Sequence, residues 1–218
     1  STVPEFEFTG FQGLASHGAA IAILIAMYYY TKNVIKKPFL WIMDRIVIAV
    51  AAGGIFVRIG NFMNSEIIGK PSGDFPLGVR FVHEGIDKRE AVQATGIQNP
   101  SKAYDAIVHN PQFAELLNSV PFRHPAQLYE AAGYVIVFLV CWYLYWKTER
   151  RKRIGYIFGV FLILLFMVRF IVEFVKESQG GFESALGLFS TGQWLSVPFI
   201  IAGIYIMWKA SKKPMIES

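Results

Sequence analysis

The chain has 218 residues, of which 54% are hydrophobic and 16% are aromatic, and its formal net charge is +5. This composition indicates a protein with several membrane-spanning helices. The basic residues lie beside apolar runs and form no stripe of their own, so the positive charge does not indicate nucleic-acid binding. The single cysteine, Cys141, excludes an internal disulfide and a thiolate metal site, and its place inside an apolar run predicts a packing residue.

Five apolar runs are long enough, or nearly long enough, to cross about 30 Å of hydrocarbon as helices. They are residues 14–30, 39–62, 125–146, 154–174 and 194–208. Ahead of them, residues 1–13 show neither the basic region nor the apolar region of a signal peptide. We therefore predict an all-α membrane protein, a polytopic helix bundle with five spans, in which residues 1–218 form a single membrane domain.

The second and third runs are separated by a long polar insertion, residues 65–122. It is rich in turn signals, which include KPSGDFP, QNPSK and HNPQF. Only residues 104–117 show a helical period, and that period is weak. His83 and His109 lie in this insertion and are predicted to be solvated, as polar loop residues usually are.

Basic residues follow the first, third and fifth runs. They are Lys32, Lys36, Lys37, Lys147, Arg150, Arg151, Lys152, Arg153, Lys209, Lys212 and Lys213. By the positive-inside rule these ends face the cytoplasm, so the insertion and the segment after residue 174 face outward. Asp44 and Arg45, at the inner end of the second run, are predicted to form an interfacial pair or a topology anchor.

Four polar groups from four runs fall at one predicted depth. His17, Arg58, Glu130 and Arg169 lie 15, 13, 17 and 16 residues from the nearest cytoplasmic charge. At the rise of an α-helix these separations are roughly 20 to 26 Å, just below the outer surface of the hydrocarbon. Each group alone is compatible with snorkelling to the interface, but their coincidence favours a shared site, because intramembrane charges are costly.

The residue types of this layer suit a lipid phosphate. Arg58 and Arg169 offer charge and paired donors, the combination that phosphate oxygens accept best. The nearby asparagines can hold hydroxyls or esters, and Glu130 and Glu173 can orient the arginines. His17 is the one group that exchanges a proton near neutral pH. The sequence therefore predicts a phospholipid headgroup at the outer leaflet as the ligand.

Five short stretches of the chain match the motifs of one known family. VRIGNFMNSEIIG, residues 57–69, matches the signature Gly-Arg-x-Gly-Asn-Phe-x-Asn-x-Glu-x-x-Gly at every fixed position except Val57. The stretches SHGAA (16–20), RHPAQLYEA (123–131), VRFIVEF (168–174) and STGQWLS (190–196) agree in the same order. The chain therefore resembles the prolipoprotein diacylglyceryl transferases.

The resemblance implies transfer of the diacylglyceryl group of phosphatidylglycerol to a lipobox cysteine of a prolipoprotein in the bacterial cytoplasmic membrane. It implies no cofactor, no metal and no nucleic acid. The chemistry of this transfer predicts catalytic roles for His17, Arg58 and Arg169. The two arginines would hold the phosphate, and His17 is either the general base or a hydrogen-bond partner of a helix or a headgroup. Substrate binding is expected at Arg58, Asn61, Asn64, Glu66, Gly69, Gln127, Tyr129, Glu130 and Glu173.

The chain departs from the family pattern in three respects. The family is expected to have seven transmembrane helices, and the first run here resembles the third of them, so two N-terminal helices are expected to be missing. Val57 replaces a glycine, and Ala19 stands where many relatives have a second glycine. The alternative hypotheses are a transporter or lipid-binding protein that uses the same polar layer without catalysis, and a family fragment without activity.

Overall fold

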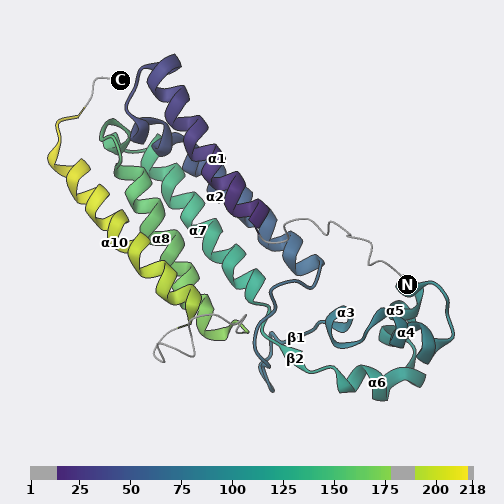
Figure 1. The fold of residues 1–218 in the computed structure, drawn as a ribbon. Coiled ribbons are helices and arrows are strands. Elements are labelled where there is room, and N and C mark those ends of the chain that lie inside the picture. The colour runs from purple at the N-terminus through teal and green to yellow at the C-terminus, as the bar shows by residue number, and fades with distance from the viewer. Residues whose placement is uncertain (1–13, 178–189, 216–218) are drawn as a thin grey trace, which may run out of the picture.

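The computed structural model describes residues 14–177 and 190–215, with side chains from residue 21 onward. Within these residues, four helices are long and apolar enough to span a membrane: α2 (Phe39–Met63), α7 (Ala126–Trp146), α8 (Tyr156–Val172, continued by the 3-10 turn η4, Glu173–Val175) and α10 (Thr191–Lys212). They lie side by side in Figure 1, with the insertion beyond one end of the bundle. The predicted helical membrane fold is confirmed.

The first predicted span coincides with α1, Leu14–Tyr30, which has 17 residues, whereas the four spans have 20 to 25 residues when η4 is counted with α8. It continues into a π-helical turn, η1 (Thr31–Ile35), which ends at Lys36 in the left-handed conformation. Thr31 is buried there, and its hydroxyl donates to the carbonyls of Met27 and Tyr28. This turn reverses the chain into α2.

The bundle is held by one apolar core shared among α2, α7 and α8. Its buried members are Val47, Ala51, Val137, Cys141, Ile157, Phe161 and Leu162. Cys141 is fully buried in this core, which confirms the prediction of a packing residue. The helix α10 joins through glycines, because a Cβ at Gly203 would lie 2.8 Å from the carbonyl oxygen of Gly159 on α8. Small residues at such a crossing allow two transmembrane backbones to approach closely.

The prediction that Asp44 and Arg45 form an interfacial pair is wrong, and the alternative of a topology anchor stays a prediction. Asp44 is buried, and its two carboxylate oxygens accept hydrogen bonds from the backbone N–H groups of Gly155, at 2.6 Å, and Phe158, at 2.8 Å. Asp44 thus caps the first turn of α8 from the neighbouring helix α2, where N–H groups have no intrahelical acceptor. Arg45 lies instead over the ring of Trp41, 3.4 Å from its centroid. The basic connection that follows α7 forms the 3-10 turn η3, Glu149–Lys152.

The insertion is more helical than predicted. A two-stranded antiparallel ribbon, β1 (Val79–Arg80) and β2 (Phe122–Arg123), closes its base. Between the strands lie α3 (Val82–Gly85), α4 (Lys88–Thr95), α5 (Pro100–His109), the 3-10 turn η2 (Pro111–Phe113) and α6 (Ala114–Ser119). These helices share a small core of Ile86, Ala91, Ala103, Tyr104, Ile107 and Val120.

The weak helix predicted over residues 104–117 is wrong in its bounds. The two Asn-Pro steps, which we interpreted as turns, are helix starts: Asn99 caps α5 and Asn110 caps η2, and each is followed by proline at the first helical position. Proline is favoured there, because its missing N–H has no intrahelical acceptor. The start of η2 at Pro111 divides the predicted helix in two.

Candidate functional site

Three short segments meet near the ends of α2, α7 and α8 and fix the base of the site. We call them the junction, residues 68–72, 122–124 and 174–177. The N–H of Gly69 donates to the carbonyl of His124, and the N–H of Lys70 donates to the carbonyl of Val175. Gly69 also bridges Lys176 in antiparallel fashion. Residues 68–72 are therefore paired with residues 122–124 on one side and with residues 174–177 on the other, which fixes the ends of three helices relative to one another.

Gly69, predicted to bind substrate, has a packing role in this junction. A Cβ at this position would collide with the carbonyl oxygen of His124 and would lie 2.8 Å from that of Val175. Only glycine at position 69 lets residues 122–124 and 174–177 approach residues 68–72 so closely. The turn that leads into it is tight, with Ser65 and Ile67 at positive φ.

The principal ion pair of the site joins α2 to α7. Arg58 Nε lies 2.9 Å from Glu130 Oε2, and the two side chains are 13% and 1% exposed. The contact is an ion pair by distance, without the alignment of a hydrogen bond. Among the described residues Glu130 is the one ion-pair partner of Arg58, whose Cζ lies 6.0 Å from the ring centroid of Tyr134. Two members of the predicted layer, Arg58 and Glu130, are therefore in contact, and the arginine is the more exposed of the two.

Lys176 extends this pair into a row of four alternating charges. Its Nζ lies 3.8 Å from Glu130 Oε1 and 3.8 Å from Glu173 Oε2, and its side chain is only 9% exposed. The row is Arg58, Glu130, Lys176, Glu173, with each charge beside one or two of opposite sign. Sequence reasoning missed Lys176, although its position three residues after Glu173 at a helix end was a usable signal.

The row ends at the N-terminus of α10. A Cβ at Gly192 would lie 2.5 Å from Glu173 Oε1 and 2.7 Å from Oε2, so the carboxylate rests directly against this glycine. A helix N-terminus favours a negative charge. Ser190 and Gln193 cap the same helix with a capping box, and Gln193 Nε2 donates to the carbonyl of Phe170. Gly192 is a second residue that sequence reasoning missed.

Arg169 lies on α8 near this row and is partly buried, and within the described part of the chain it enters no ion pair. The hydroxyl of buried Tyr134 interacts electrostatically with Glu130, Arg58 and Arg169. Tyr134 comes four residues after Glu130, on the same face of α7. Tyr134 therefore interacts both with Arg169 and with the Arg58–Glu130 pair.

The remaining predicted residues divide into two groups. Gln127 is fully buried and donates from Nε2 to the backbone carbonyl of Glu66, at 2.5 Å, so it fixes the turn after α2. Tyr129 is partly buried, and its hydroxyl lies 3.3 Å from Nδ1 of His124.

The second group takes no part in the row of charges. Asn61 is partly exposed at the end of α2, and the side chains of Asn64 and Glu66 are exposed. The side chain of His17, in the first turn of α1, lies outside the described residues. The roles assigned to all these residues stay predictions.

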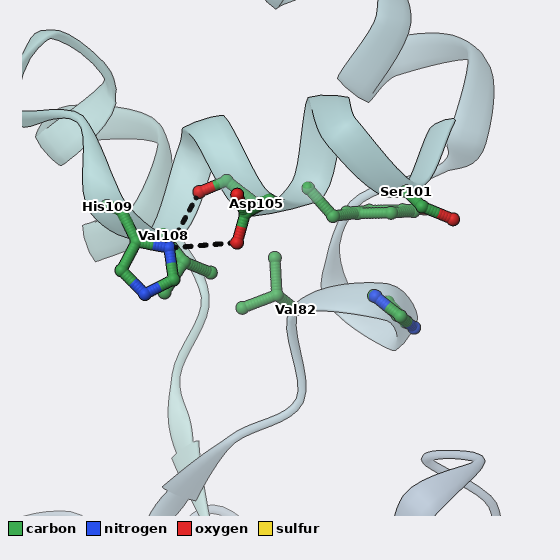
Figure 2. Close-up of a pocket in the computed structure, with 7 residues that line it drawn as sticks. Val82, Ser101, Asp105, Val108 and His109 are labelled. Atoms are coloured by element: carbon green, nitrogen blue, oxygen red, sulfur yellow. Dashed lines mark hydrogen bonds and ion pairs between the residues drawn. The ribbon is translucent and has the colours of Figure 1, made fainter. Parts of the chain in front are cut away.

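The insertion carries a separate hollow of about 300 Å³, which is lined by residues between positions 82 and 109 and by no member of the row of charges. Figure 2 shows its lining, in which His109 Nδ1 lies 3.1 Å from Asp105 Oδ1 and 3.0 Å from the Asp105 carbonyl oxygen. The ring of His83 packs 4.2 Å from that of Tyr104. Both histidines are exposed, which confirms the prediction of solvated residues. Within the described residues, no cluster of His, Cys, Asp or Glu could hold a metal ion.

Residues 6–209 match the family described as prolipoprotein diacylglyceryl transferase. The chain is 39% identical to a phosphatidylglycerol–prolipoprotein diacylglyceryl transferase of Tolumonas auensis, over 92% of this chain and 64% of the relative. Proteins of the same name from Bacteroides fragilis and Porphyromonas gingivalis are 36% and 37% identical, over 97% and 94% of this chain and 63% and 65% of the relatives. The chain thus spans a little under two thirds of the length of these relatives.

Proposed function

The chain belongs to the prolipoprotein diacylglyceryl transferase family, and on this premise we propose that it transfers the diacylglyceryl group of phosphatidylglycerol to the lipobox cysteine of a prolipoprotein. In this reaction the cysteine sulfur attacks the glycerol carbon that bears the phosphate ester. A carbon–sulfur bond forms, and the carbon–oxygen bond to phosphate breaks. Glycerol phosphate leaves with the bonding electron pair, and the thiol proton passes to a base.

The observation that carries this proposal is the Arg58–Glu130 pair at the end of a transmembrane bundle. A displacement of this kind is accelerated by donors directed at the leaving group, where negative charge develops. Arg58 is held by a buried carboxylate through Nε, so its terminal donors are oriented before the substrate arrives. Arg169, which enters no ion pair among the described residues, supplies the second positive charge for the phosphate.

The charge balance of the site suits a singly charged anion. The site contains three cations, Arg58, Arg169 and Lys176, and the two carboxylates of Glu130 and Glu173, which leaves one positive charge in excess. A phosphodiester such as phosphatidylglycerol carries one negative charge and completes this balance. Asn61, partly exposed one turn after Arg58 on α2, is placed to hydrogen-bond the ester or the headgroup hydroxyls.

The nucleophile belongs to the second substrate, so the only cysteine of this chain can remain buried in the core. His17 accepts the thiol proton in this proposal, a general-base role that typically contributes about 100-fold to 10,000-fold in rate. The site lies near the outer leaflet of the bacterial cytoplasmic membrane, since the basic connections between spans lie at the opposite ends of the helices. Neither a metal nor a cofactor takes part in this mechanism.

The test supplies the full-length protein with headgroup-labelled and acyl-labelled phosphatidylglycerol and a lipobox peptide. We expect acyl label in a thioether-linked peptide and an equal amount of headgroup label in free glycerol phosphate. Binding of the lipid without either product would contradict the transferase and favour a lipid-binding protein or transporter that uses the same layer. Release of headgroup without labelled peptide would indicate hydrolysis and would also contradict the proposal.

A further inference from the structure

Lys176 is an unusual lysine, because its charged side chain is almost entirely buried. Lysine is rarely buried unless it is paired, and here it has two carboxylate partners at equal distance. Its backbone is equally constrained, since it follows η4 and bridges Gly69 in the junction. The direction of its side chain is therefore set by the fold and does not depend on a bound ligand.

The partners of Lys176 have different surroundings. Glu130 is 1% exposed and has two cations, Arg58 on Oε2 and Lys176 on Oε1. Glu173 has Lys176 as its only ion-pair partner among the described residues. Without Lys176, Glu173 would therefore rest against the start of α10 with no cation beside it.

A phosphate at Arg58 would change this balance. The phosphate would compete with Glu130 for the guanidinium. Without Lys176, Glu130 would have to share its only cation with the phosphate, which is costly for a buried carboxylate. Because Lys176 contacts its other oxygen, Glu130 keeps a counter-ion while the terminal donors of Arg58 bind the phosphate. The ammonium group of Lys176 is almost entirely buried and contacts both carboxylates, so its charge is already balanced before a phosphate binds.

On the basis of the proposed function, we propose that Lys176 is a positioning residue that holds Glu130 and Glu173 in place so that Arg58 can bind the lipid phosphate. It does not contact the substrate. Its loss weakens binding of an anionic phospholipid more than it slows the chemical step, because the arginine that binds phosphate is drawn back toward Glu130.

The experiment measures equilibrium binding of phosphatidylglycerol in mixed micelles together with KM and kcat for transfer, on the full-length protein. Lys176→Met is expected to raise Kd and KM by about tenfold to a hundredfold, the range for losing an interaction with a charged group. Its kcat is expected to change by less than about threefold. Lys176→Arg, which keeps the charge, is expected to restore most of the affinity.

Lys70→Met is the matched control. Lys70 lies in the same junction and donates from Nζ to the carbonyl of Phe174, but it is exposed and enters no ion pair with a described carboxylate. The Lys70→Met variant therefore removes the same charge without removing a partner of Glu130 or Glu173. Its Kd and KM are expected to stay within about twofold of wild type. Thermal unfolding of each variant reports purely structural damage, and Lys176→Gln serves as a second neutral variant if Lys176→Met does not fold.

The possible outcomes separate the two proposals. A wild-type protein that binds phosphatidylglycerol but forms no product would overturn the transferase, whereas weakened binding in Lys176→Met would still support the role of Lys176. Unchanged Kd and KM in a folded neutral variant would overturn the role of Lys176 and leave the transferase intact. An equal loss of affinity in Lys70→Met would also overturn it, because the effect would then belong to the net charge of the junction.

Discussion

Gly192 and Glu173 are in direct contact, although they come from different helices. The carboxylate lies so close to the backbone of Gly192 that a side chain there would have to displace it. This contact sets the end of the row of charges that begins at Arg58. The start of α10 therefore helps to position the site, although α10 contributes no charge to it.

Gly192→Ala is expected to move Glu173 away from α10 and to lower transfer activity. The added methyl overfills a tight contact, at a typical cost of about 1 to 3 kcal/mol in unfolding free energy. Gly53→Ala is the matched control, because nothing lies within 4 Å of a Cβ built at Gly53 on α2. Thermal unfolding and the initial rate of transfer are measured for both. Equal behaviour of the two variants would show that the contact at Gly192 has no consequence.

Asp44→Ala is expected to destabilise the bundle without altering the site. The change removes a buried carboxylate that caps α8, and hydrogen bonds to a charged group contribute about 1.5 to 3 kcal/mol. Asp44→Asn retains one acceptor and is expected to lose less. Asp74→Ala, at an exposed aspartate of the insertion, is expected to change the unfolding temperature little. An Asp44→Ala protein as stable as Asp74→Ala would contradict the capping role.

Tyr104 gives the insertion a pH dependence above neutrality. Burial raises the pKa of Tyr104 above its ordinary value of 10.0, and the nearby Asp87 and Glu90 raise it further. The hydroxyl donates to the carbonyl of Ile86, at 2.8 Å, and a tyrosinate could not. The pKa of Tyr104 is higher in the folded state than in the unfolded state. The stabilisation is therefore complete below pH 10 and is lost as the pH rises through the folded-state pKa.

Tyr104→Phe is therefore expected to lower the unfolding free energy of the insertion by about 1 kcal/mol at pH 7. The difference from wild type is expected to shrink above pH 10, as wild type loses the same hydrogen bond. Amide hydrogen exchange in α4 and α5 measures it. Tyr143→Phe, at an exposed tyrosine of α7, is the control. A difference that is constant from pH 7 to pH 11 would refute this origin of the pH dependence.

The sequence was sufficient to predict the parts of the fold and site that depend on composition and helical depth. Long apolar runs predict spans, and arginine and glutamate inside such runs stand out, so Arg58 and Glu130 were found at one level. Lys176 was missed because a lysine just beyond a span ordinarily reaches water. Its burial results from the junction, a pairing of segments more than 50 residues apart that no local pattern reveals.

The roles of Gly192, Asn99 and Asn110 depend on contacts that the sequence pattern around them does not reveal. Gly192 has no local conformational reason to be glycine, since what requires it is a carboxylate 19 residues earlier in the chain. Asn99 and Asn110 precede proline, a pattern that fits both turns and helix starts. The helix starts are formed here, because the helices that follow pack on the apolar core of the insertion.

The central claim, that Arg58 binds the leaving phosphate, is tested most directly by the kcat/KM of transfer in Arg58→Gln. Removing one donor of this kind typically costs about 100-fold to 1,000-fold in rate. Arg45→Gln is the control, since Arg45 lies on the same helix, enters no ion pair with a described residue, and has its guanidinium over the rings of Trp41 and Tyr145. We expect kcat/KM to fall by at least about 100-fold in Arg58→Gln and by less than about threefold in Arg45→Gln. A folded Arg58→Gln protein that transfers diacylglyceryl at the wild-type rate would contradict the account.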